Sequence, residues 1–145
     1  MGIRPSNRFS YALKALVDLA VHQGTGPVTT AAIARRQGIP VGSLEQLFNR
    51  LRRRGLVEAE RGPRGGYRLS RPAKQIRVRA VFEALEPPAS SKRRSVPADG
   101  PAGTVWRQVE SAVKTTLEAT TLEALIGQAR DRVASPMQHR FTFHI

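Results

Sequence analysis

The sequence predicts a mainly α-helical fold with one small β-hairpin, followed by a long C-terminal helix. Three observations lead to this prediction. Apolar residues recur at helical spacing in the first half of the chain and again after residue 104. Between Gly55 and Pro72, two short strand-like runs flank a turn that holds three glycines and a proline within six residues. Residues 87–103 are rich in Pro, Ser, Ala and Gly and separate the two helical parts.

The first two helices are predicted from capping residues and apolar spacing. Ser6 is a suitable N-cap for a helix over about residues 8–22, whose apolar residues form one broad face. Thr29 or Thr30 begins a short second helix over about residues 31–37. Because this second helix is short and bears few apolar residues, it is expected to pack through one side only.

The third helix combines a buried face with a polar one. A tight turn at Gly38 leads into it, and Gly55 ends it after a run of three arginines. Apolar residues at i, i+3, i+4 and i+7 predict the buried face, and these are Leu44, Leu47, Phe48 and Leu51. The outward residues are candidates for reading base edges in the major groove of DNA, and these are Ser43, Glu45, Gln46, Asn49 and Arg50. A short helix, a tight turn and a longer helix with a polar face make a helix-turn-helix unit.

A β-hairpin and a fourth helix complete the predicted winged unit. Strands are expected over residues 56–60 and 67–70, and the exposed loop 61–66 between them is a wing whose backbone can approach a phosphate closely. Tyr67 is expected to anchor this wing to the core rather than to contact DNA. A short helix over about residues 78–86 is expected to pack back on the first helix.

The remaining chain is predicted as a loop, two helices and a tail. An apolar stripe marks a long helix over about residues 104–119, and Thr120 with Glu123 forms a capping box that begins a further helix over about residues 122–131. The predicted division is a winged helix-turn-helix DNA-binding domain at 1–86, a flexible loop at 87–103, dimerisation helices at 104–133 and a tail at 134–145.

The apolar stripe of the long helix predicts a two-fold homodimer. A helix beyond the compact winged unit has little of its own protomer to pack on, so a second copy is the expected partner. The candidate interface residues are Trp106, Val109, Val113 and Leu117. A helix folded back on its own domain is the alternative, because Trp106 and Val109 suit either arrangement.

Charge is concentrated in the winged unit. The net charge is +13, and residues 1–80 carry sixteen Lys and Arg against four Asp and Glu, whereas residues 81–145 carry eight against seven. The basic residues lie on a helix and a hairpin beside polar, base-reading side chains, which favours double-stranded DNA over a membrane surface as the partner. A basic surface that serves only solubility is the alternative interpretation.

Composition and motifs exclude several classes of protein. The chain has no cysteine, which excludes disulfides, thiolate metal sites and cysteine redox chemistry. An enzyme is not expected, since the sequence lacks a catalytic carboxylate-pair motif and a phosphate-binding glycine loop between a strand and a helix. The apolar run at 15–21 is short and interrupted by Asp18, so no signal peptide or membrane span is predicted and a cytoplasmic protein is expected.

Four segments of the chain, in order, form a specific set of motifs. They are RFSYALKALVDLA at 8–20, IARRQGIP at 33–40, LEQLFNRLRRRGLVEAERGPRGGYRLSRP at 44–72, and a helix that begins near Trp106 and ends in TLEAL at 121–125. With these segments the chain resembles the Rrf2 family of bacterial winged-helix transcription regulators. Together they cover most of residues 3–130, which makes the resemblance far more specific than a lone helix-turn-helix pattern.

The resemblance implies roles on DNA for individual residues. Glu45 and Gln46 would face base edges, since a Gln amide pairs with adenine and a Glu carboxylate accepts from cytosine N4. The wing would bring Arg61 into the minor groove. Phosphates would be met in the wing by Arg64 and the backbone of Gly65 and Gly66, and elsewhere by Ser6, Arg8, Tyr11, Thr29 and Arg52. For Arg52 to Arg54, a solvated helix end is an equally good interpretation.

Two departures from the family pattern limit what can be carried over. Pro40 stands where relatives often place a capping Ser, and Gly42 with Ser43 stands where they often place Ser and an aromatic residue, so the base preference is not transferable. The sensory branch of the family holds an iron–sulfur cluster with three cysteines in the loop that matches residues 87–103, and this loop has none. The three histidines do not replace three thiolates. A member without a cluster or other cofactor is therefore expected.

Without a cluster, the resemblance implies that a partner protein or a small molecule acts as effector. A cavity between the winged unit and the long helix, walled by residues such as Phe82, Leu85 and Trp106, would suit a ligand, although an apolar wall at that place is more often core. The predicted function is a homodimeric, sequence-specific regulator that represses from a palindromic promoter site. A non-specific architectural nucleic-acid-binding protein is the alternative.

Overall fold

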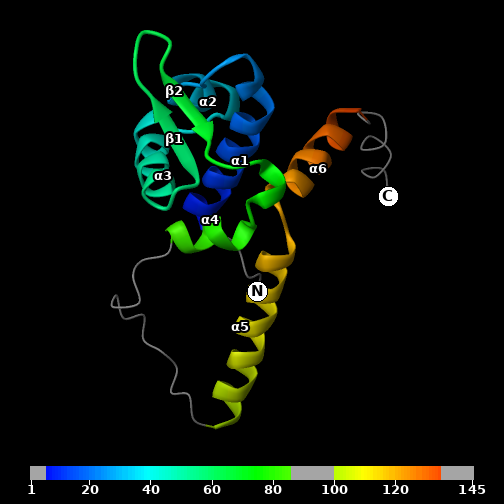
Figure 1. Ribbon diagram of the computed structural model, residues 1–145. Coiled ribbons are helices and arrows are strands. Elements are labelled where there is room, and N and C mark those ends of the chain that lie inside the picture. The colour runs from blue at the N-terminus through cyan, green and yellow to red at the C-terminus, as the bar shows by residue number, and fades with distance from the viewer. Residues whose placement is uncertain (1–5, 86–99, 135–145) are drawn as a thin grey trace.

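The computed structural model describes residues 6–85 and 100–134. Its helices are α1 (Asn7–His22), α2 (Thr30–Gln37), α3 (Val41–Arg53), α4 (Val78–Leu85), α5 (Pro101–Ala119) and α6 (Leu122–Ala134), and its strands are β1 (Val57–Glu60) and β2 (Gly66–Leu69). Short 3-10 turns lie at Gln23–Thr25 and Ala73–Gln75. The prediction of a mainly helical fold with one hairpin is confirmed, and α5 projects from the winged unit as an arm (Figure 1).

Helices α1, α2 and α3 pack around one core, as the apolar spacing predicts. The hydroxyl of Ser6 accepts from the N–H of Phe9 at 3.3 Å and caps α1, and the hydroxyl of Thr29 accepts from Ala32 at 3.1 Å and caps α2. The buried face of α3 consists of Leu44, Leu47, Phe48 and Leu51, as predicted. Full burial of each such side chain stabilises the fold by about 1.5–3 kcal/mol, so this face fixes the rotation of α3 and leaves its polar residues outward.

The hairpin is held to the helices by backbone and aromatic contacts. Strands β1 and β2 pair antiparallel, with Glu60 opposite Gly66 at the wing end. Val28 adds a bridge to Tyr67, with N···O distances of 3.0 and 2.8 Å in the two directions. The ring of Tyr67 lies 4.7 Å from that of Phe48 on α3, centroid to centroid. The prediction that Tyr67 anchors the wing is therefore confirmed.

The bridge to Val28 explains why β2 begins with glycine. A Cβ on Gly66 would lie 2.6 Å from the carbonyl carbon and oxygen of Val28, closer than real side chains approach a backbone. The strand therefore passes Val28 only because position 66 lacks a side chain. The sequence predicts Gly66 in the exposed loop 61–66, whereas the structure places it at the start of β2, close to the backbone of Val28.

Helix α4 packs against α1, as predicted. Phe82 meets Phe9 of α1 edge to face, with ring centroids 5.5 Å apart. Val81 and Leu85 join the same buried core as the residues of α1 and α3. Helix α4 thus closes the winged unit on the side from which the arm extends (Figure 1).

Two predicted boundaries around α5 and α6 are wrong. Helix α5 begins at Pro101, so the loop expected to reach residue 103 ends earlier, since proline suits the first turn of a helix. The cap of α6 is Thr121 rather than Thr120, because the Thr121 hydroxyl accepts from the N–H of Ala124 at 3.2 Å while the Thr120 hydroxyl donates to Thr116. The rest of the predicted loop and the tail lie outside the described residues.

The junction of α5 and α6 is hydrogen-bonded to the winged unit through the backbone. The N–H of Val78 donates to the carbonyl of Thr120, and that of Leu122 donates to the carbonyl of Ile76, both at 2.9 Å. Leu122 and Ile126 of α6 are buried in the main core beside α1. The root of the arm is therefore fixed, while most of α5 extends away from the domain (Figure 1). No helix within the described ranges has the length and apolar character that a membrane span needs.

Candidate nucleic-acid interface

The outward face of α3 presents most of the predicted base-reading residues. Ser43, Glu45, Gln46 and Asn49 are all exposed. Arg50 is half-buried, and its Nη1 donates to the carbonyl oxygen of Leu85 at the end of α4 at 3.1 Å. One N–H of Arg50 thus joins α3 to the end of α4, while the guanidinium keeps further N–H groups that can donate to a ligand.

A groove between α1 and α3 brings two predicted groups of residues together. Its volume is about 390 Å³. Arg8 and Tyr11, predicted as phosphate contacts, line it from α1. The predicted base-reading residues that line it from α3 are Ser43, Gln46 and Arg50. Residues that lie far apart in the sequence therefore share one concave surface.

The start of α3 at this groove has no side-chain cap. Pro40 occupies the N-cap position and also lines the groove, and no side chain of the described residues caps the helix there. The first N–H groups of a helix lack partners within the helix and carry the positive end of its dipole. With Arg8 beside them, they form a setting that favours an anion such as a DNA phosphate. The proline that departs from the family pattern thus leaves this helix end open.

The wing presents arginines at its tip and closes its own backbone with glycines. Arg61 and Arg64 are exposed. The N–H of Gly65 donates to the carbonyl of Gly62 at 2.9 Å, and Gly65 and Gly66 are half-buried against neighbouring backbone. The amide of Gly65 is therefore occupied, so contact with a phosphate falls to the arginine side chains.

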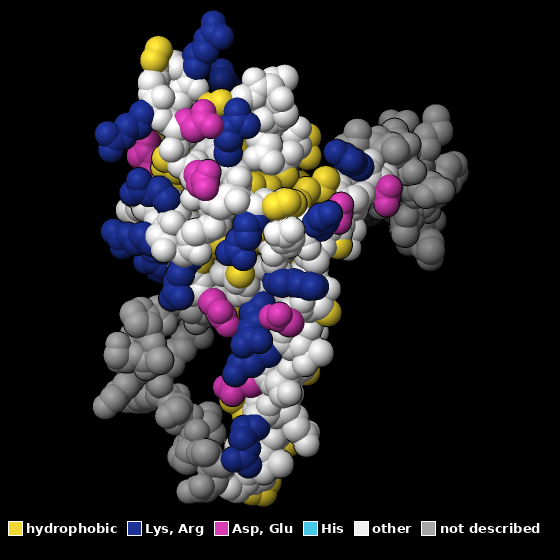
Figure 2. Space-filling model, viewed as in Figure 1, with side chains coloured by type: hydrophobic (Ala, Val, Ile, Leu, Met, Phe, Trp, Pro, Cys, Tyr) yellow, Lys and Arg dark blue, Asp and Glu magenta, His cyan; other side chains and the backbone are white. Residues whose placement is uncertain are grey.

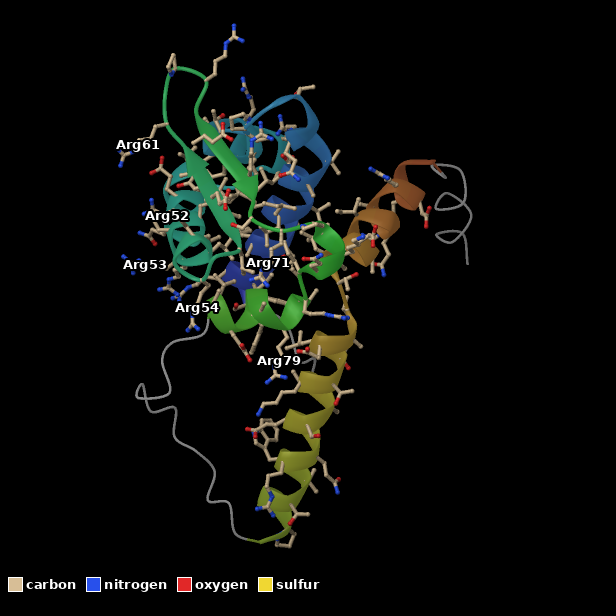
Figure 3. The ribbon with its side chains drawn as sticks, in the orientation of Figure 1. Arg52, Arg53, Arg54, Arg61, Arg71 and Arg79 are labelled. Carbon is tan, nitrogen blue, oxygen red and sulfur yellow. The ribbon has the colours of Figure 1, made fainter. Side chains whose placement is uncertain are left out.

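Basic side chains line one edge of the winged unit. Lys and Arg gather along this edge in Figure 2. Arg52, Arg53, Arg54 and Arg61 project outward on the same side in Figure 3, and all four are exposed. We refer to these four residues as the basic edge. Clustered charge of one sign raises the local potential and attracts a polyanion.

The predicted phosphate contacts at helix starts have a second task. Ser6 and Thr29 are exposed, and the hydroxyl oxygen of each accepts the cap hydrogen bond of its helix. Each hydroxyl keeps its own hydrogen, which remains able to donate to a phosphate oxygen. Capping and phosphate contact are therefore compatible at both positions.

A buried carboxylate that the sequence analysis did not assign locks α1 to α2. Asp18 is 3% exposed, and its two oxygens accept from Nε of Arg36 at 3.2 and 3.0 Å and from Nη2 at 2.6 Å. Nε2 of Gln37 donates to it at 2.9 Å. Burial alone raises the pKa of Asp18, but the hydrogen bonds from Arg36 and Gln37 and the charges of Arg36 and His22 outweigh it and hold the pKa below 3.8. The only signal in the sequence is an acid within an apolar helical run.

A second unassigned contact joins α1 to the wing. Oε1 of Gln23, just after α1, accepts from the N–H of Leu69 in β2 at 2.9 Å. This bond satisfies a backbone donor at the open edge of the hairpin. A polar residue at the end of a helix gives no sequence signal for such a contact, because solvent is its usual partner.

The predicted dimerisation residues lie along α5. Trp106 is 52% exposed and Val113 is 41% exposed, while Val109 and Leu117 are half-buried. Val105, at 58% exposed, extends this apolar stripe. Hydrophobic side chains show along the edge of the arm in Figure 2. The alternative of a helix folded back on its own domain is not what the structure shows, since α5 projects from its root (Figure 1).

Comparison with known proteins decides the family. The family model Rrf2, described as an iron-dependent transcriptional regulator, matches residues 5–128. This chain belongs to the Rrf2 family. The resemblance seen in the sequence is confirmed, and the protein is a transcriptional regulator that binds DNA.

Relatives and solved structures agree with this assignment. The HTH-type transcriptional regulator IscR of Serratia proteamaculans is 36% identical over an alignment of 146 positions, gaps included, that covers 97% of this chain and 89% of the relative. The structure of T. potens IscR matches with a TM-score of 0.75 and 36% identity over 89% of this chain and 90% of that one. CymR, the global cysteine regulator of B. subtilis, matches with a TM-score of 0.75 and 33% identity over 88% of this chain and 98% of that one.

The iron dependence in the family's description does not fit the donor groups of this chain. An iron–sulfur cluster needs thiolate ligands, and the 145 residues include no cysteine. Within residues 6–85 and 100–134, no three side chains of His, Asp or Glu are grouped as a metal site. The residues present therefore do not suit the cluster.

Proposed function

We propose that this Rrf2-family regulator is a homodimer that binds a palindromic promoter site, represses transcription there and works in the cytoplasm without an iron–sulfur cluster. The observation that carries the proposal is the groove between α1 and α3. It unites Arg8 and Tyr11 with the base-reading face of α3 at a helix start that has no side-chain cap among the described residues. Such a surface suits a phosphate and the adjoining base edges together.

In this proposal some residues contact base edges and determine sequence preference, while others contact phosphates and fix the position of the protein on the duplex. Glu45 and Gln46 read base edges in the major groove together with Ser43, Asn49 and Arg50, and Arg61 enters the minor groove. At the wing, the side chain of Arg64 meets the DNA phosphates, and the glycine turn Gly65–Gly66 lets the loop lie close to them. Register on the duplex is fixed by phosphate contacts from Ser6, Arg8, Tyr11, Thr29 and Arg52.

The dimer in this proposal forms through the apolar stripe of α5. Its exposed Trp106 and Val113 are covered when two copies meet about a two-fold axis. Two α3 helices then face successive major grooves about 34 Å apart, which requires a palindromic site. Occupation of a promoter by this dimer excludes other proteins from the same DNA, which supports repression.

Selection of binding sites from a random duplex pool tests the proposal. The full chain should enrich one palindromic motif and bind it on the order of a thousandfold more tightly than a scrambled duplex at the same salt concentration. Gln46→Ala should alter the preferred base at one position of each half-site, while Arg61→Ala should weaken binding with the major-groove motif retained. Enrichment of no motif, with equal binding to all duplexes, would contradict sequence-specific recognition.

A further inference from the structure

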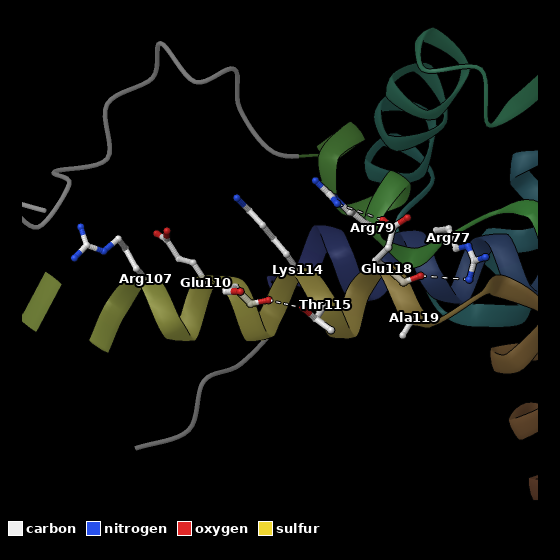
Figure 4. Close-up of a pocket in the computed structure, with 9 residues that line it drawn as sticks. Arg77, Arg79, Arg107, Glu110, Lys114, Thr115, Glu118 and Ala119 are labelled. Atoms are coloured by element: carbon white, nitrogen blue, oxygen red, sulfur yellow. Dashed lines mark hydrogen bonds and ion pairs between the residues drawn. The ribbon is translucent and has the colours of Figure 1, made fainter. Parts of the chain in front are cut away.

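A charged groove lies where the arm meets the winged unit (Figure 4). Its volume is about 730 Å³, and it is lined by the first turn of α4 with the residue just before it and by one face of α5. The charged residues of its lining are Arg77, Arg79, Arg107, Lys114, Glu110 and Glu118. We refer to it as the arm groove. Four cations against two carboxylates give this concave surface a net positive charge.

The arm groove stays open when the apolar stripe of α5 is covered. An α-helix turns by about 100° per residue, so Arg107 and Lys114 point about 80° or more away from Trp106, Val109 and Val113, whereas Glu110 lies at the border of the stripe, nearer to Trp106. Figure 4 shows the charged side chains rising from the side of α5 on which α4 lies. A second copy seated on the stripe therefore leaves the groove accessible to solvent.

Three cations of the arm groove, Arg77, Arg79 and Lys114, are only partly neutralised within the described structure. Nε of Arg79 pairs with Glu83 at 2.9 Å, while its Nη1 reaches Glu118 at a longer 3.4 Å. Nη1 of Arg77 donates to the carbonyl oxygen of Glu118, also at 3.4 Å. Lys114 makes no ion pair with the residues that the structure describes. A ligand with several negative charges thus finds loosely held partners here.

The lining of the arm groove differs from the apolar wall that the sequence suggested for a cavity at this place. Phe82, Leu85 and Trp106, expected as the walls of a cavity at this place, are not among the residues of the groove. Phe82 packs on Phe9, Leu85 is buried in the core, and Trp106 faces solvent. Phe82 and Leu85 therefore serve as core, the alternative that the sequence analysis left open, and the arm groove beside them is charged.

We propose that the arm groove binds a small anion with at least two negative charges, such as a phosphate ester or a di- or tricarboxylate, as the effector of this regulator. The regulatory part of this inference rests on the proposed function. The anion would compete with the Glu118 carboxylate for Arg79, which joins α5 to α4. Since the root of the arm is fixed at Thr120, loosening this pair changes the angle of α5 and with it the spacing of the two α3 helices. Anion and DNA affinities are then coupled reciprocally.

Calorimetric titration of the full chain with citrate and with pyrophosphate, at ionic strength held constant with potassium chloride, tests the site. At least one of the two anions should bind saturably with one site per chain. The double variant Arg107→Gln/Lys114→Gln should lower that affinity on the order of tenfold or more, because it removes two charged donors. Arg53→Gln/Arg54→Gln removes the same charge from the basic edge and should leave anion binding unchanged. The absence of saturable binding, or an equal loss in both double variants, would overturn the site.

Measurements of duplex affinity with and without the anion test the effector site independently of the proposed function. Without added anion, Arg107→Gln/Lys114→Gln should bind the selected duplex as the unmodified protein does, and only the unmodified protein should change its affinity when the anion is added. Weaker duplex binding by this variant without anion would mean that the groove meets DNA phosphates, which overturns the effector site. Saturable anion binding by a protein that selects no DNA motif would instead support the anion site and contradict the proposed function.

Discussion

At the scale of single residues, Asp18 determines how α1 meets α2. Its carboxylate accepts four hydrogen bonds from Arg36 and Gln37 while almost wholly buried. Asp18→Asn keeps the shape but loses the charge and one acceptor, so the free energy of unfolding should fall by about 2 kcal/mol, the usual value for hydrogen bonds to a charged group. Urea denaturation at neutral pH measures this. Asp131→Asn on the exposed side of α6 is the matched control and should change little.

The same carboxylate makes part of the stability depend on pH. The pKa of Asp18 is lower in the folded chain than its ordinary value of 3.8, so the folded state binds this proton less readily than the unfolded state. The contribution is complete above that ordinary value and is lost as the pH falls through the lower, folded-state pKa. Free energies of unfolding for the unmodified protein and Asp18→Asn should therefore converge as the pH falls below about 4. A difference that stays constant in that acidic range would show that the charge of Asp18 does not stabilise the fold.

Arg50 and Arg52, two residues apart on α3, should respond differently to loss of charge. Arg50 donates to the carbonyl of Leu85, whereas the side chain of Arg52 is exposed and makes no hydrogen bond within the described residues. Arg50→Met should lower the free energy of unfolding by about 1 kcal/mol, because the carbonyl at the end of α4 loses its donor. Arg52→Met should leave stability unchanged and weaken binding to all duplexes alike. Thermal unfolding and fluorescence anisotropy of both variants check this, and equal stabilities would show that the bond to Leu85 contributes nothing.

At the scale of elements, the position of the wing depends on the close approach of the β2 backbone at Gly66 to the backbone of Val28. A Cβ on Gly66 would meet the Val28 backbone at 2.6 Å, whereas one on Gly42 in α3 would meet nothing within 4 Å. Gly66→Ala should lower the free energy of unfolding by about 1–3 kcal/mol through overpacking. Gly42→Ala should raise it by up to about 1 kcal/mol through helix propensity. Chemical denaturation of the pair measures both, and a tolerated Gly66→Ala would mean that the bridge to Val28 is not needed.

Elements set by local periodicity were predictable from the sequence, and so was some apolar packing between them, while the polar contacts between elements were not. The face formed by Leu44, Leu47, Phe48 and Leu51 follows from helical spacing alone, and so does the outward exposure of Glu45 and Gln46. The bond from Leu69 to Gln23 and the network at Asp18 depend on which helices meet, and the spacing within one helix holds no such information. The cap of α6 was misplaced by one residue because adjacent threonines offer the same side chain, and only the backbone pairing of Leu122 with Ile76 decides between them.

At the scale of the whole molecule, α5 carries two surfaces of different chemistry, an apolar stripe and a charged groove. Its root is held by backbone bonds at Thr120 and Leu122, so the direction of α5 is tied to the domain that carries α3. Its apolar stripe and most of its charged groove lie on different faces, so the proposed dimer and the proposed anion would not compete for the same surface. In the proposed dimer, a change at the root would be transmitted along α5 to the second copy.

Disruption of the stripe tests whether the arm joins two copies. Val113 is 41% exposed in the single chain, so Val113→Glu should leave the helical content unchanged, yet in a dimer it would bury an unpaired charge. A cost of about 3 kcal/mol raises the dimer dissociation constant on the order of a hundredfold. Gln108→Glu adds the same charge at an exposed position off the stripe and should leave the dimer intact. Sedimentation velocity distinguishes the variants, and a dimer that survives both Val113→Glu and Trp106→Glu would place the interface elsewhere.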